Sequence, residues 1–79
     1  MTLKVISAEK ILFDGKVSLV TLPGEAGLFT VLENHASLVS VLTRGEIEYQ
    51  PEDGSERQSM PIEGGIADVD RNVVSVCVY

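Results

Sequence analysis

The sequence predicts an all-β fold, an antiparallel sandwich or flattened barrel of about nine or ten short strands. Three observations lead to this prediction. Apolar and polar residues alternate with a period close to two along most of the chain. β-Branched residues are frequent, and turn-forming residues recur at short intervals. Helix signals are nearly absent, so the strands are expected to pair with one another throughout one domain, residues 1–79.

The first half of the chain divides into short apolar segments separated by turn residues. The predicted strands are Leu3–Ser7, Ile11–Phe13, Lys16–Leu22, Leu28–Leu32 and Ser37–Thr43. Asp14-Gly15 is a strong tight-turn dipeptide and is expected to separate the second strand from the third. Pro23–Gly27 is expected to be a loop, because proline removes a ladder donor and two glycines permit positive φ. Glu33–Ala36 interrupts the alternation again.

The second half continues the same pattern. The predicted strands are Glu46–Gln50, Glu56–Ile62, Ile66–Asp70 and Val73–Tyr79. Alternation in the first of these places Ile47 and Tyr49 in the core and the glutamates in water. Pro51–Ser55 is the clearest hairpin turn, and Arg71-Asn72 is expected to be another. Glu63-Gly64-Gly65 marks a bulge or a close backbone approach.

Composition limits how this domain can be stabilised. With 79 residues, no Trp, two Phe and two Tyr, the core must be aliphatic, and a domain of this size buries only about 60% of its unfolded surface. The single cysteine, Cys77, excludes an internal disulfide, and no His or Cys cluster offers a structural zinc site. We expect Cys77 to be a buried, unreactive thiol. A partner surface is one way for so small a core to be completed.

The net charge of −6 is concentrated in residues 46–70, where the acids greatly outnumber Arg57. Binding to nucleic acid or directly to an anionic membrane is therefore not expected, since both require clustered Lys and Arg. No signal peptide and no membrane-spanning segment is predicted. The sequence indicates a soluble protein of a reducing compartment that another protein must hold if it works at a membrane.

Catalytic and cofactor-binding motifs are not convincing. His35 is the only histidine and no Gly-x-Ser-x-Gly elbow accompanies it, so an anchoring or partner-contacting role is favoured over a hydrolase base. Gly24–Gly27 resembles part of a phosphate-binding loop but lacks the Gly-Lys-Ser/Thr ending. Asp68 and Asp70 share a strand face and are better explained as exposed acids than as cation ligands. No catalytic, cofactor-binding or metal-binding residue is predicted.

Two features favour binding to other proteins. Apolar residues of Leu28–Leu32 adjoin the Pro23–Gly27 loop, and either an exposed partner site or ordinary strand burial would account for them. Gly64-Gly65 could admit a partner backbone or bend a strand. An alternative is a free-standing sandwich that binds a small ligand or an unrelated protein through Pro23–Leu32, and a small ligand would require a closed apolar pocket of roughly 300 Å3 or more.

Several sequence segments, taken in their order along the chain, together resemble the epsilon subunit of bacterial F-type ATP synthases. They are Val5–Gly15, Thr21–Gly27, Val31–Ala36, Gly45–Ile47 and Ile62–Gly65. The resemblance covers nearly the whole chain, and its S-x-E-x-x-x-F-x-G signature, N-H-A turn and G-G pair are specific in combination.

The resemblance implies a β-sandwich of about ten strands in the rotor stalk of a proton- or sodium-translocating ATP synthase. Such a subunit is non-catalytic, binds no cofactor, and links the gamma subunit to the c-ring so that ion flow is coupled to ATP synthesis. It lies peripherally on the cytoplasmic side of the bacterial plasma membrane. The expected c-ring side is Gly24, Glu25, Ala26, Gly27 and Leu28, and the expected gamma side is Asn34, His35, Ala36, Gly64 and Gly65.

Two departures from the family pattern affect these expectations. Glu33 and Ser37 stand where prolines commonly flank the N-H-A turn, which is expected to loosen it. The chain ends at Tyr79, where many family members continue into a two-helix domain that can bind ATP and inhibit hydrolysis. That helical domain is expected to be absent from residues 1–79, which would be either a naturally short epsilon subunit or one domain of a longer protein, and its regulatory role is not assigned.

Overall fold

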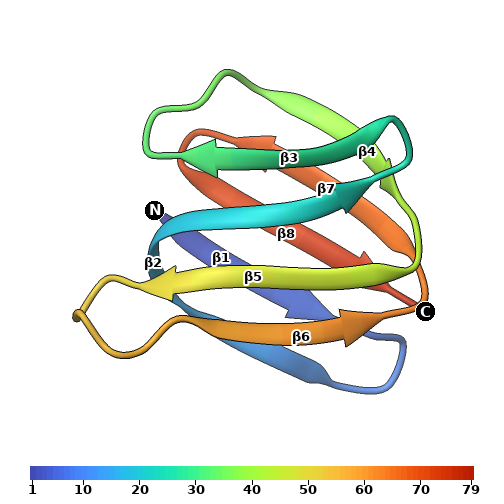
Figure 1. Cartoon of the computed structure of the whole chain (residues 1–79), viewed down its shortest axis with the longest axis horizontal. Helices are drawn as coiled ribbons and strands as arrows, with labels where there is room; N and C mark the ends of the chain where they lie inside the picture. The colour runs from blue at the N-terminus through green and yellow to red at the C-terminus, as the bar shows by residue number, and fades with distance from the viewer.

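The computed structural model describes the whole chain, residues 1–79, and contains eight strands and no helix (Figure 1). The strands are β1 (Thr2–Ile6), β2 (Ile11–Gly24), β3 (Gly27–Leu32), β4 (Leu38–Leu42), β5 (Gly45–Pro51), β6 (Gln58–Ile62), β7 (Gly65–Asp70) and β8 (Val73–Val78). The predicted all-β class is confirmed, although the number of separate strands is smaller than the nine or ten expected.

The strands form two layers that share β2. One layer, called here the four-strand layer, has the order β3, the second half of β2, β5, β6. The other, called the five-strand layer, has the order β4, β7, β8, β1, the first half of β2. The four-strand layer lies in front of the five-strand layer in Figure 1. All pairs are antiparallel except β1 and β8, which run parallel, so the prediction of a purely antiparallel sheet is wrong at this one pair.

The predicted turn at Asp14-Gly15 is also wrong, because β2 is continuous through it. Asp14 and Gly15 pair with Lys4 and Leu3 of β1, and this ladder keeps the backbone extended. A side chain at Gly15 would lie 3.0 Å from the Phe13 ring, so glycine here makes room for that ring rather than for a turn. The strand bends later, at a bulge near Val17–Leu19, where it crosses between the layers.

Several predicted boundaries shift by a few residues. The loop expected over Pro23–Gly27 is reduced to a two-residue turn at Glu25 and Ala26, because Pro23 and Gly24 pair with Leu28 and Gly27. β6 begins at Gln58 rather than Glu56. Turns at Pro51–Ser55 and at Arg71-Asn72 are present as predicted.

The core lies between the layers and is built from the inward half of each alternating pattern. Its fully buried side chains with the largest volumes are Leu3, Leu22, Ile47, Val5, Val17, Val20, Val31, Val69, Val74 and Val76. The predicted inward positions Ile47 and Tyr49 are both buried. Phe13 and Tyr49 join the layers as a tilted aromatic pair with ring centroids 4.3 Å apart. No buried polar side chain interrupts this core.

Candidate protein-docking surfaces

An unbroken row of apolar side chains crosses the outer face of the five-strand layer. Strand register joins one outward residue from each of five strands: Ile11, Ile6, Cys77, Ile66 and Val41, a set called here the apolar row. Ile11, Ile66 and Val41 are each about half exposed, at 59%, 49% and 47%. Val39, two residues from Val41 on the same face, is 69% exposed. The outer face of this layer thus presents apolar atoms to solvent across its full width.

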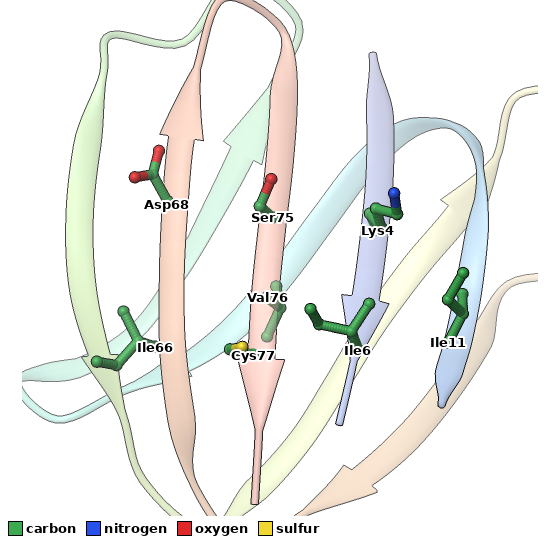
Figure 2. Close-up of a pocket in the computed structure, with 8 residues that line it drawn as sticks. All are labelled: Lys4, Ile6, Ile11, Ile66, Asp68, Ser75, Val76 and Cys77. Carbon is green, nitrogen blue, oxygen red and sulfur yellow. The ribbon is translucent and has the colours of Figure 1, made fainter. Parts of the chain in front are cut away.

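A depression of about 480 Å3 lies along this row, as Figure 2 shows. Ile66, Cys77, Ile6 and Ile11 line one side of it, and a parallel row of Asp68, Ser75 and Lys4 lines the other. The depression is open to solvent, and the core residue Val76 lies at its floor. It is therefore not the closed apolar pocket that the small-ligand alternative requires.

The predicted burial of Cys77 is wrong, because its thiol is exposed. Val74 and Val76 of the same strand are buried on the opposite side, toward the core. Cys77 is exposed because no further layer covers the outer face of the five-strand layer. Cys77 therefore lies in the apolar row between Ile6 and Ile66.

The predicted c-ring residues, Gly24 to Leu28, form the corner at which β2 turns into β3. This corner is bonded to the end of β4: the Glu25 backbone N–H donates to the Val41 carbonyl at 2.9 Å. Leu28 is 75% exposed, so apolar surface does lie at this tip, as one of the two predicted explanations requires.

Gly64 precedes β7 and Gly65 begins it, at the same end of the sandwich as the Gly24–Leu28 corner. Leu42 of β4 pairs with both Gly24 and Gly65, which brings the three strands together. The predicted close backbone approach at the glycine pair is present, and it is made by the chain's own β8. A Cβ on Gly65 would lie only 2.3 Å from the Cys77 carbonyl oxygen.

Asn34, His35 and Ala36 lie at the opposite end of β4, beside the turn between β7 and β8 (Figure 1). Asn34 and Asn72 bond reciprocally: the Asn34 backbone N–H donates to Asn72 Oδ1 at 2.6 Å, and Asn72 Nδ2 donates to Asn34 Oδ1 at 3.0 Å. His35 is exposed, and its Nδ1 lies 2.7 Å from the Ala36 carbonyl oxygen.

The two predicted gamma-side segments are therefore not adjacent. Gly64-Gly65 lies next to the Gly24–Leu28 corner, and Asn34–Ala36 lies a strand length away, at the far end of β4. The outer face of the five-strand layer runs along β4 and β7 from the Asn34–Ala36 end of the sandwich to the Gly64-Gly65 end.

The outer face of the four-strand layer is different in character. Its central row is Thr30, Thr21, Glu48 and Ser59, called here the polar row. The Thr21 and Thr30 hydroxyls are 2.9 Å apart and share a hydrogen bond. At the hairpin beyond β5, hydrogen bonds from the Ser55 hydroxyl and then the Ser55 backbone N–H hold the pKa of Asp53 below its usual range.

Groups for catalysis do not converge anywhere in the chain. No cluster of three or more His, Cys, Asp or Glu side chains has the spacing of a metal site. The one hydrogen bond of the His35 ring is to a backbone carbonyl, and no serine or carboxylate orients it as a base. No helix is long and apolar enough to cross a membrane.

The apolar row was not predicted from the sequence. Ile6, Ile66 and Val41 each occupy an outward position in a strand whose existence was predicted, but no inward or outward side was assigned to those strands. The sequence signal for the row was one apolar residue at an outward-facing position in each of these strands. Only the strand register shows that these residues are neighbours, and the register is not contained in the alternation of any single strand.

The structure is a two-layer β-sandwich with a filled aliphatic core and an apolar row across one outer face, the kind of exposed surface that marks protein contacts in many domains. The chain belongs to a family with such a fold. Residues 1–79 match the family described as ATP synthase, Delta/Epsilon chain, beta-sandwich domain. The predicted resemblance is confirmed.

Individual relatives agree with this assignment. The chain is 40% identical over 76 residues to the ATP synthase epsilon chain of Leptospira borgpetersenii, covering 96% of this chain and 58% of that protein. It is 40% identical over 78 residues to the ATP synthase epsilon chain of a Nitratiruptor species, covering 99% and 60%. The chain therefore spans somewhat more than half the length of these relatives.

Solved structures agree on the fold. A chain of the Euglena gracilis mitochondrial ATP synthase, in a structure of its OSCP, F1 and c-ring, superposes with a TM-score of 0.88 at 26% identity, covering 96% of this chain and 48% of that one. A chain of the Tetrahymena thermophila mitochondrial ATP synthase central stalk and c-ring gives 0.80 at 19% identity, covering 98% and 61%.

Proposed function

We propose that this chain is a non-catalytic subunit of the central stalk of a rotary ATP synthase, linking the gamma subunit to the c-ring. Membership of the epsilon family supports this role, as does the likeness to a chain in a structure of an ATP synthase with its c-ring. The subunit would lie peripherally on the cytoplasmic side of the bacterial plasma membrane and support the coupling of ion flow to ATP synthesis.

The observation that carries this proposal is the apolar row. Fully burying one Ile or Val side chain contributes about 1.5–3 kcal/mol, so half-exposed residues such as Ile66 and Val41 leave part of that gain unrealised in the free domain. A second protein that covers the row would recover it, and would complete the small core that a domain of this size can build. We assign the row to the gamma contact.

The ends of the sandwich extend this assignment. Asn34, His35 and Ala36 at one end, and Gly64 and Gly65 at the other, would border the gamma contact along β4 and β7. The corner Gly24, Glu25, Ala26, Gly27 and Leu28 would face the c-ring, with Leu28 as its most exposed apolar side chain. A two-layer sandwich between two partners suits a torque-bearing part, because its strands are hydrogen-bonded along their length.

The test is association of the purified domain with the gamma subunit from the same organism. Ile66→Asp introduces a charge into the apolar row and is expected to weaken binding about 10- to 100-fold, from the loss of one buried side chain. Thr30→Asp makes the same charge change on the polar row and is the matched control, with binding expected within about twofold. Both variants should keep the melting temperature of the wild type, since both sites are on outer faces.

Two results would contradict the proposal. The wild-type domain could show no affinity for gamma, or Thr30→Asp could weaken binding as much as Ile66→Asp does. A surface plasmon resonance or calorimetric titration distinguishes these results.

A further inference from the structure

A second depression, of about 440 Å3, lies at the Asn34 end of the sandwich and has a different lining from the one along the apolar row. Its walls are almost entirely polar and come from the loop before β4 and the turn between β7 and β8: Asn34, His35, Ala36, Ser37, Arg71 and Asn72. Arg71 brings a permanent positive charge to it, in a chain of net charge −6.

The polar groups around Arg71 are bonded to one another and leave its guanidinium without an ion pair. Asn34 and Asn72 bond reciprocally, and Ser37 Oγ donates to Asp70 Oδ1 at 2.8 Å. The ion pairs of the chain involve the Met1 ammonium and Arg44. The guanidinium of Arg71 therefore has five donors and no carboxylate partner within the molecule.

The turn itself gives no reason for an arginine at this position. Arg71 and Asn72 have φ of 50° and 63°, the left-handed pair that a two-residue hairpin turn requires. Glycine and asparagine adopt this conformation readily, whereas a side chain as long as that of arginine does so at a cost in free energy. The local fold would be served better by glycine, so the guanidinium has to be explained by something outside the turn.

We propose that the Arg71 depression receives a carboxylate of an acidic segment in the partner protein. The charge complementarity is local: the Arg71 guanidinium has no ion pair, is planar and suits a bidentate carboxylate, while the adjacent Asp70 carboxylate accepts a hydrogen bond from Ser37 instead. Asn34 Nδ2 makes no hydrogen bond within the chain and offers a further donor. The depression lies at one end of β4, and the apolar row reaches β4 at Val41 near the other end. The contact would therefore form a charged rim beside an apolar centre, a common arrangement in protein interfaces.

This inference rests on the proposed function, because it takes the acidic segment to belong to the same central-stalk partner. Its experiment measures the affinity of the domain for the gamma subunit at several salt concentrations. Arg71→Gly is expected to weaken binding about three- to tenfold and to flatten the salt dependence, because a charged contact is lost. The same variant should melt at a higher temperature, since glycine relieves the left-handed residue. Opposite signs for binding and stability separate the contact from a folding defect.

A matched control is Arg57→Gln, which removes one positive charge from the other side of the molecule, beside Glu48 and Ser59. Binding of this variant should stay within twofold of the wild type. Arg71→Lys keeps the charge and loses the planar fork, so its affinity should lie between those of wild type and Arg71→Gly. Equal effects of Arg71→Gly and Arg57→Gln would overturn the inference, because only the net charge would then matter.

A direct probe keeps the inference separate from the proposed function. A glutamate-rich synthetic peptide titrated into the 15N-labelled domain should shift the backbone amides of Asn34, Arg71 and Asn72, and Arg71→Gly should abolish those shifts. If the domain does not bind gamma but the peptide shifts are present, the proposed function fails and the carboxylate site stands. If gamma binds wild type and Arg71→Gly equally and the peptide has no effect, the inference fails alone. Saturable shifts with inorganic phosphate in place of the peptide would also overturn it, in favour of a small-anion site.

Discussion

The two outer faces of the sandwich are built by the same alternation over the same core, and yet the central rows that cross them have opposite chemistry. On the five-strand layer, register aligns Ile11, Ile6, Cys77, Ile66 and Val41 into the apolar row. On the four-strand layer it aligns Thr30, Thr21, Glu48 and Ser59 into the polar row. Alternation decides which side chains enter the core, whereas register decides what the outward side chains form together.

The apolar row carries a free-energy cost that the polar row does not, although Leu28 and Leu32 beside Thr30 also expose apolar surface on the four-strand layer. Threonine and glutamate in outward positions satisfy their polar groups with water or with each other, as the Thr21–Thr30 hydrogen bond does. Isoleucine and valine in the same positions make no favourable interaction with water in the free domain, so they favour association with another protein. The polar row therefore resembles an ordinary solvent-facing surface, whereas the apolar row resembles the surface of a protein interface.

Gly65→Ala should have the largest effect on stability, because it disturbs the pairing of β7 with β8, two of the strands that carry the apolar row. A Cβ at this position would lie 2.3 Å from the Cys77 carbonyl oxygen and 3.1 Å from Val78 Cα, and both are backbone atoms that cannot rotate away. β7 and β8 would have to separate, so we expect a loss of about 3 kcal/mol in unfolding free energy, as for overpacked core sites. Urea unfolding followed by circular dichroism measures it.

Gly54→Ala provides the matched control in the other layer. Gly54 has a φ of 86° and no atom near its would-be Cβ, so only backbone strain opposes the substitution. The expected cost is about 1 kcal/mol. If the two variants lose equal stability, contact between β7 and β8 is not what requires glycine at position 65.

A smaller effect is expected from placing one positive charge on either outer face. Val41→Lys should reduce retention on a hydrophobic-interaction column and lower binding of an apolar dye, because it interrupts the apolar row. Ser59→Lys on the polar row, where the neighbouring outward residues are Arg57 and Pro61, should change neither. Both variants should keep their unfolding free energy within about 0.5 kcal/mol of the wild type, as surface substitutions usually do. Equal retention of the two variants would mean that the faces do not differ in exposed apolar surface.

The sequence was sufficient where one strand carries its own information and insufficient where strands have to be combined. Ile47 and Tyr49 were correctly placed in the core, because alternation within β5 determines their side. Asp14-Gly15 was wrongly predicted to turn, because pairing with β1 holds Gly15 extended, and that pairing is a property of two segments. The family's motifs identified Gly24–Leu28 and Asn34–Ala36, yet no motif indicates that they lie at opposite ends of β4. Arg71 was read only as a turn residue, since its missing ion pair is visible only in three dimensions.

The smallest effect concerns the hairpin at the edge of the four-strand layer, where Asp53 accepts hydrogen bonds from the Ser55 hydroxyl and backbone N–H. These bonds favour the charged carboxylate and lower its pKa in the folded chain, so folding is stabilised above the pKa of the unfolded chain. That contribution is lost as the pH falls through the lowered pKa. Asp53→Asn should therefore be less stable than wild type near neutrality, and the difference in urea midpoint should shrink as the pH is lowered past the usual range of aspartate.

Ser55→Ala tests the cause of that small effect. Removing the hydroxyl takes away the largest of the interactions that lower the pKa of Asp53, and the backbone N–H bond remains. The pH-dependent difference between Asp and Asn at position 53 should therefore be smaller in the Ser55→Ala background than in the wild type. Because Asp53 is fully exposed, solvent screens the interaction and both differences should be modest. If the stability difference between Asp and Asn at position 53 were the same at every pH, the charge of Asp53 would not contribute to the stability of the hairpin.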